Sequence, residues 1–137
     1  MNNLTASLED YLEIIYNSIE TNNSIKAVEI AKRLNISRAS VSEALTRLSD
    51  KGLIVYEGHK GITITEEGRK KAKNVIVKHN TLSAFFENTL GITKEIAEES
   101  ACKMEHVISE DVFNRIEQFQ KYCEENQMFV ENFKKGY

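Results

Sequence analysis

The fold is decided by residues 24–64, which read SIKAVEIAKRLNISRASVSEALTRLSDKGLIVYEGHKGITI. Apolar residues recur at helical spacing up to Leu34, a tight turn follows at residues 35–37, and Ser37 can cap a second helix that ends near Gly52. β-forming residues at 53–56 and alternating ones at 62–65 then flank a turn, which predicts a two-stranded hairpin. Two short helices joined by a tight turn and followed by a hairpin predict a winged helix-turn-helix.

Helical patterns also lie on both sides of this stretch. A helix over about 7–21 is predicted from a capping-box start at Ser7, and residues 22–24 break it. A long helix over about 66–90 follows the hairpin and ends at Gly91. Thr93 and Ser109 are expected to cap two further helices, through about 108 and 123, with a short helix or frayed tail to Tyr137. The predicted fold class is mainly α.

Composition excludes several classes of protein. The chain has 137 residues, 41% of them hydrophobic and 28% charged, which suits one domain or two small ones with a buried core. No apolar run approaches the roughly 18 to 20 residues that span a membrane, and the N-terminus lacks a secretion signal, so we expect a cytoplasmic protein without a membrane partner. Two cysteines without Cys-x-x-Cys spacing exclude a disulfide-stapled secreted module.

Charge is segregated along the chain. Residues 1–25 hold four acids and no Lys or Arg, residues 26–73 hold eleven bases against six acids, and residues 74–137 hold seven bases against eleven acids. A basic segment between acidic flanks favours local contact with a polyanion such as a phosphate backbone. The alternative at this point is an unevenly charged, solvated surface.

The helix that begins after Ser37 has one face suited to a DNA groove. It is expected to bury Val41, Leu45 and Leu48 and to leave small polar groups and arginines outward. Short side chains allow close approach to DNA, and basic ones neutralise phosphates. The candidate DNA-binding residues are Ser37, Arg38, Ala39, Ser40, Ser42, Glu43, Arg47 and Lys60. A winged helix that only docks other proteins remains an alternative.

A second group of residues has the donor types of a metal site. Cys102, Glu105 and His106 stand at i, i+3 and i+4, so they are expected to project from one helix face. Such a set can hold a divalent transition metal when other segments complete the coordination, and Asp10, Glu13 and His79 are the candidates for that. A buried cysteine beside a surface glutamate and histidine is the alternative explanation.

Several segments, in this order and spacing, resemble the DtxR/MntR family of metal-dependent transcriptional repressors. They are SLEDYLEIIY at residues 7–16, the turn and helix at 37–48, Gly68-Arg69 with His79 beyond, and EESACKMEHVIS at residues 98–109. The resemblance implies a homodimer that binds a palindromic DNA operator and represses metal-uptake genes. It also implies a winged helix-turn-helix DNA-binding domain at 1–73 and a helical metal-binding and dimerisation domain at 74–137, with metal between them.

The ligand sets of the family's two branches match this chain differently. The manganese-type set matches Asp10, Glu13, His79, Glu105 and His106, and it departs at Cys102, where that branch has glutamate. The iron-type set matches Cys102, Glu105 and His106, and it departs at Asp10, where that branch has methionine. The second iron-type site matches His79 and departs at Ser83, where it has glutamate, and at Glu98, where it has histidine. The resemblance thus implies ligands at Asp10, Glu13, His79, Glu98, Cys102, Glu105 and His106.

The donor types bear on the choice of metal. Carboxylates and imidazoles accept Mn(II) and Fe(II) alike, whereas the Cys102 thiolate gains more from Fe(II), Co(II) or Zn(II). We expect Fe(II) or Mn(II), iron being narrowly favoured, with one or two ions per subunit because Glu13 and Glu105 can bridge two ions as in the manganese branch. The family's repressors approach DNA bases at positions that here are Ser37, Ala39 and Glu43.

The sequence also bears on two alternative functions, an enzyme and a thiol redox sensor, and on the surface through which two copies would pair. An enzyme using Cys102 and His106 is disfavoured because no orienting third group or oxyanion donor is evident. A thiol redox sensor using Cys102 and Cys123 is the alternative to a metal sensor. Apolar side chains expected to form the dimer surface are Val107, Ile108, Phe113, Ile116 and Phe119.

Overall fold

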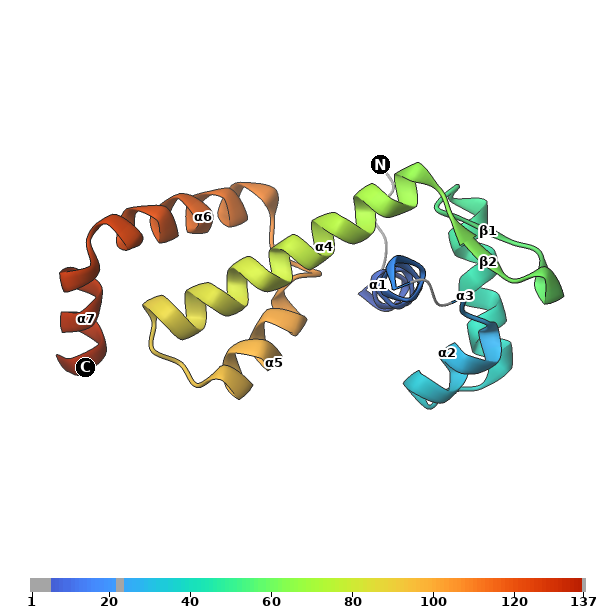
Figure 1. Cartoon of the computed structure of the whole chain (residues 1–137), viewed down its shortest axis with the longest axis horizontal. Coiled ribbons are helices and arrows are strands. Elements are labelled where there is room, and N and C mark those ends of the chain that lie inside the picture. Colours follow the sequence, from blue (N-terminus) through green and yellow to red (C-terminus); the bar gives the residue numbers. More distant parts are fainter. Residues whose placement is uncertain (1–5, 22–23, 137) are drawn as a thin grey trace. The chain divides into compact units, whose positions relative to one another are not determined.

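The computed structural model describes residues 6–21 and 24–136, which fall into two compact units divided between Val75 and Ile76. The first unit holds helices α1 (Ala6–Glu20), α2 (Ala27–Leu34) and α3 (Arg38–Asp50), then strand β1 (Ile54–Tyr56), a 3-10 turn (Gly58–Lys60) and strand β2 (Ile62–Ile64) (Figure 1). Helix α4 (Glu66–Ala84) crosses the division. The second unit continues with a π-helical turn η2 (Phe85–Thr89), α5 (Lys94–Met104), α6 (Glu110–Glu125) and α7 (Gln127–Gly136).

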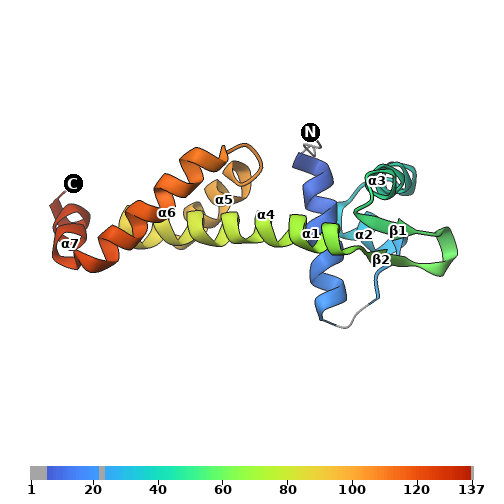
Figure 2. The same cartoon turned by 90° about the horizontal axis from the view of Figure 1, so that it is seen from above.

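The first unit has the predicted winged helix-turn-helix. Helix α2 ends at Leu34, and its C-cap residue Asn35 has a left-handed backbone (φ 53°, ψ 50°). The Ser37 hydroxyl accepts a hydrogen bond from the Ser40 N–H at 3.1 Å and so caps α3. The two strands pair antiparallel, with Ile54 opposite Ile64, and their connecting turn extends away from the three helices (Figures 1 and 2).

The core of this unit joins the three helices to one face of the hairpin. Completely buried side chains include Leu12 and Ile15 of α1, Ile30 of α2 and the predicted trio of α3, Val41, Leu45 and Leu48. From the hairpin, Ile54 and Ile62 belong to the same cluster. Since α1 contacts both α3 and β2, this packing fixes how α3 presents its outer face.

The start of α4 is locked to the hairpin by Thr65 and Gly68. The Thr65 hydroxyl lies 2.7 Å from the Gly52 carbonyl oxygen, to which it can donate, and it accepts from the Gly68 N–H at 3.0 Å. A Cβ atom on Gly68 would collide with the Leu53 carbonyl oxygen, so only glycine allows this approach.

The second unit packs α5, η2, α6 and α7 around a smaller core. Leu82, Ala97 and Ala101 are completely buried, and Phe113 and Cys123 are nearly so. The Ser109 hydroxyl caps α6 as predicted, accepting from the Val112 N–H at 3.3 Å. Lys78, a buried lysine of α4, lies 2.5 Å from a Glu110 carboxylate oxygen, so this ion pair ties α4 to the first turn of α6.

Several details differ from the sequence predictions. Helix α1 begins at Ala6, so Ser7 lies inside its first turn, and the predicted break at Asn22 and Asn23 falls outside the described residues. The long helix is α-helical only to Ala84, because a wider π turn takes its last residues. Helix α5 ends at Met104 rather than near 108.

Two predicted side-chain roles also change. Thr93 stands at the N-cap of α5 but makes no side-chain capping hydrogen bond. Phe113, expected on a dimer surface, is only 5% exposed and fills the core of its own unit, whereas Val107 and Phe119 are exposed as expected. Among the described helices none is long and apolar enough to cross a membrane.

Replacing Gly68 with alanine is expected to destabilise the first unit. The added methyl group collides with the Leu53 carbonyl, and we expect a loss of about 1–3 kcal/mol in the free energy of unfolding, measured by chemical denaturation. Gly136→Ala is the matched control, since nothing lies within 4 Å of a Cβ there. Equal free energies of unfolding for the two variants would contradict the proposed close contact between Gly68 and the Leu53 carbonyl.

Candidate functional site

The imidazole of His79 lies between two carboxylates of the second unit. Its Nδ1 atom is 2.7 Å from Glu105 Oε2 and its Nε2 atom is 2.7 Å from Glu98 Oε2. His79 comes from α4, Glu98 from α5, and Glu105 from the end of α5, where the helix stops. The His79 ring therefore contacts one carboxylate within α5 and a second one just after that helix.

Ser83 supports this arrangement from α4. It stands one helical turn after His79, is buried, and its hydroxyl donates to Glu98 Oε1 at 2.8 Å. Sequence reasoning noted Ser83 only as a departure from the iron-type ligand set and missed this contact. The i, i+4 spacing from His79 was the available signal, because both side chains then lie on one face of α4.

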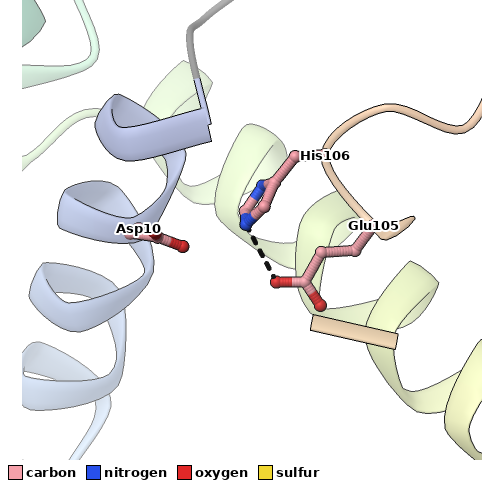
Figure 3. A group of neighbouring side chains, drawn as sticks. All are labelled: Asp10, Glu105 and His106. Atoms are coloured by element: carbon pink, nitrogen blue, oxygen red, sulfur yellow. Dashed lines mark ion pairs between the residues drawn. The ribbon is translucent and has the colours of Figure 1, made fainter. Parts of the chain in front are cut away.

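Glu105 and His106 form the buried part of the cluster. The Glu105 side chain is 2% exposed and that of His106 is 6% exposed, and His106 Nε2 lies 3.4 Å from Glu105 Oε1 (Figure 3). A buried carboxylate beside two imidazoles combines the harder and intermediate donors that divalent Mn, Fe, Co and Zn accept. The residues present in this unit therefore fit a divalent transition metal.

The two carboxylates shift the titration of their partners. Burial by itself would lower the pKa of His79, but the hydrogen bond to Glu98 and the charge of Glu105 outweigh it and raise this pKa above its ordinary value of 6.5. Hydrogen bonds from Ser83 and His79 lower the pKa of Glu98 below its ordinary 4.5. Near neutral pH the ring therefore carries more positive charge than a free histidine.

The remaining predicted ligands come from other segments or differ in exposure. Asp10 and Glu13 are half-buried residues of α1 in the first unit, one turn apart. Cys102 is exposed, whereas Glu105 is buried and follows the last residue of α5. The three residues predicted to share one helix face thus differ in burial and local structure, because the helix ends before Glu105. Cys123, the second cysteine, is buried.

The candidate DNA-binding residues gather on the outer side of α3 and on the hairpin. Seven are exposed, namely Ser37, Arg38, Ala39, Ser40, Glu43, Arg47 and Lys60, and Ser42 is half-buried. The four consecutive residues 37–40 form the N-terminal end of α3, the part of such a helix that enters a major groove. Lys60 lies in the turn of the hairpin, 3.9 Å from Glu57 in an exposed pair that water screens.

Two family models match the chain in succession. One, the iron dependent repressor, N-terminal DNA binding domain, matches residues 3–62, and the other, the iron dependent repressor, metal binding and dimerisation domain, matches residues 65–128. The HTH-type transcriptional regulator MJ0568 of Methanocaldococcus jannaschii is 41% identical over 117 residues, 85% of this chain and 94% of that protein. MntR of Shouchella clausii is 31% identical over 130 residues, 95% of this chain and 90% of that protein. The chain belongs to the DtxR/MntR family of metal-dependent transcriptional repressors.

Solved structures of similar fold support the assignment to this family. The manganese regulator SloR has a TM-score of 0.73 at 30% identity, over 84% of the repressor described here and 54% of SloR. The protein SSo2273 of Sulfolobus solfataricus has a TM-score of 0.72 at 26% identity, over 85% of the repressor and 89% of that chain.

Family membership confirms the predicted function class. The repressor is a metal-dependent transcriptional regulator with double-stranded DNA and a second copy of itself as partners. Members of this family are transcriptional regulators, and the likenesses give no support to the thiol redox sensor.

The pairing of His79 predicts a pH dependence in metal-free protein. Because the pKa of His79 is raised, its ion pairs stabilise the fold fully below pH 6.5 and lose that contribution as the pH rises through the raised value. Because the pKa of Glu98 is lowered, its contribution is present above pH 4.5 and is lost as the pH falls through the lowered value.

Glu98→Gln is expected to lower the titration midpoint of His79, followed by NMR of the ring protons with a chelator present, because the variant removes one carboxylate charge. Glu99→Gln is the matched control. Glu99 is the next residue of α5, is exposed, and lies 3.2 Å from Lys103 Nζ. A midpoint that both variants leave unchanged would show that Glu98 does not pair with His79 in solution.

Proposed function

We propose that the repressor senses Fe(II) or Mn(II) in the cytoplasm and, with metal bound, represses the genes that take up that metal. The observation that carries this proposal is the cluster of His79, Glu105 and His106, in which a buried carboxylate lies within 3.4 Å of two imidazoles. Buried charge of this kind, shared by residues of separate segments, is typical of a ligand site.

The proposed ligand set adds residues from both units to this cluster. His79, Cys102, Glu105 and His106 belong to the second unit, and Asp10 and Glu13 of α1 belong to the first. These side chains would supply enough donors for five or six positions around an ion, and the set would hold one or two ions per subunit. A bound ion would supply positive charge to compensate these acidic side chains.

Cys102 sets the proposed preference among metals. Its side chain is exposed, and a thiolate ligand favours Fe(II), Co(II) or Zn(II) over Mn(II). The carboxylates and imidazoles do not discriminate strongly between Mn(II) and Fe(II). Fe(II) is therefore the proposed activator, with Mn(II) next and Co(II) and Zn(II) as substitutes in vitro.

Metal binding can change DNA binding because the proposed ligands are divided between the two units. Without compensation the charges of Asp10, Glu13 and Glu105 repel one another. Gathering them around a cation favours the arrangements of the two units in which all ligands meet, and operator binding then selects among these arrangements. A tenfold gain in DNA affinity needs about 1.4 kcal/mol of coupling, and reciprocity requires operator DNA to tighten metal binding equally.

On DNA, phosphate and base contacts have separate roles. Arg38, Arg47 and Lys60 are proposed to bind phosphates, which orients the protein without choosing a sequence. Ser37, Ala39 and Glu43 are proposed to meet base edges, and the Glu43 carboxylate can accept from a cytosine amino group. Two copies related by two-fold symmetry then require a palindromic operator.

The proposal is tested by DNA binding in the absence of oxygen. Fluorescence anisotropy of an operator fragment, found by selection from random sequences, is measured while the metal-free repressor receives Fe(II), Mn(II), Co(II) or Zn(II). Metal is expected to raise the affinity of the wild type by about tenfold or more, and His106→Ala is expected to abolish that gain while the protein stays folded. Lys103→Ala, at an exposed residue of α5, is the control. Metal-independent binding by the wild type would overturn the proposal.

Cys102→Glu tests the choice of metal in the same assay. The substitution replaces the soft thiolate with a carboxylate, so the concentration of Mn(II) that activates DNA binding is expected to fall relative to that of Fe(II). An unchanged ranking of the metals would mean that Cys102 does not ligate.

Arg47→Ala tests the docking of α3. Each phosphate-binding cation removed makes the slope of log affinity against log salt shallower by about 0.9, so losing one from each subunit of the homodimer is expected to make it shallower by about 1.8. Binding is expected to weaken uniformly across operator sequences, measured by anisotropy at several salt concentrations. Lys121→Ala, at an exposed base of α6, is the control. An unchanged slope for Arg47→Ala would place the DNA elsewhere.

A further inference from the structure

Both carboxylate oxygens of Glu98 are engaged by α4. Oε2 lies 2.7 Å from His79 Nε2, and Oε1 accepts from the Ser83 hydroxyl at 2.8 Å. His79 and Ser83 are one helical turn apart on α4, so one face of this helix contacts both oxygens of the Glu98 carboxylate.

The two nitrogens of His79 have different surroundings. Nδ1 faces Glu105, whose side chain is 2% exposed, and Nε2 faces Glu98, whose side chain is 47% exposed. The buried side also holds His106. A ligating histidine usually binds metal through one nitrogen and donates the other N–H to a carboxylate, which fixes the ring and makes it a stronger donor.

We propose that Glu98 is a positioning residue and not a metal ligand. Together with Ser83 it keeps the proton of His79 on Nε2 and turns Nδ1 toward Glu105 and His106, so that Nδ1 is the metal-binding atom. This inference rests on the proposed metal-sensing function, and it replaces the direct ligand role expected for Glu98 from the sequence. Ser83 contributes by donating to the other carboxylate oxygen, Oε1, which holds Oε2 within hydrogen-bonding distance of Nε2.

Two substitutions at the same position separate a positioning role from a ligand role. Glutamine at 98 keeps an acceptor for Nε2–H and a partner for Ser83, whereas alanine removes both. Co(II) affinity, measured by competition with a chelator under anaerobic conditions, is expected to fall less than about tenfold in Glu98→Gln and about 10- to 100-fold in Glu98→Ala. Glu99→Ala, at the exposed neighbour, is expected to match the wild type.

Two spectroscopic measurements report on the atoms involved. The absorption spectrum of bound Co(II) is expected to be the same in the wild type and in Glu98→Gln, because the ligand set is unchanged. In Zn(II)-loaded protein labelled with ¹⁵N-histidine, His79 is expected to show a metal-bound Nδ1 and a protonated Nε2, and the Nε2 proton is expected to exchange faster in Glu98→Ala.

The outcomes separate this inference from the proposed function. Equal loss of affinity in Glu98→Gln and Glu98→Ala, with an altered Co(II) spectrum, would make Glu98 a ligand and overturn the inference while metal sensing stands. Metal bound to Nε2 would overturn it too. A wild type that binds neither Co(II) nor Zn(II) would instead overturn the proposed function, and the inference with it. Circular dichroism of each variant verifies that it is folded.

Discussion

A buried carboxylate needs compensating positive charge or hydrogen bonds, and Glu105 imposes that requirement on the whole second unit. His79 reaches it from α4 and His106 from the turn after α5. Side-chain contacts of His79 and Ser83 with Glu98 join α4 to α5, and the small residues Ala97 and Ala101 of α5 are completely buried in the same unit. The packing of the unit and its ligand chemistry therefore arise from the same contacts.

The first unit meets a different requirement, which is to present one helix rigidly. Its apolar core anchors α3 from behind, and Thr65 and Gly68 fix the end of the hairpin against α4. The core of this unit is a cluster of apolar side chains from the three helices and the hairpin. The proposed DNA-binding residues thus lie in the first unit, whereas most of the proposed metal ligands lie in the second.

The winged helix could be predicted from the sequence because its signals are local. The Ser37 cap, the buried positions of α3 and the alternation in β2 each depend on residues within a few positions of one another. The contacts of His79 with Glu98 and Glu105, and of Ser83 with Glu98, could not be predicted in this way. They join residues that are far apart in the sequence and meet only through tertiary packing. The end of α5 at Met104 and the π turn after Ala84 likewise have no local sequence signal that we identified.

The position of His79 between two carboxylates makes protons competitors of the metal. A ring whose pKa is raised holds its second proton more firmly, and that proton must leave before the nitrogen can bind an ion. In the proposed centre the same concentration of free metal therefore fills fewer sites at lower pH. Derepression would then begin at higher metal concentrations, so the metal concentration to which this sensor responds would depend on the pH.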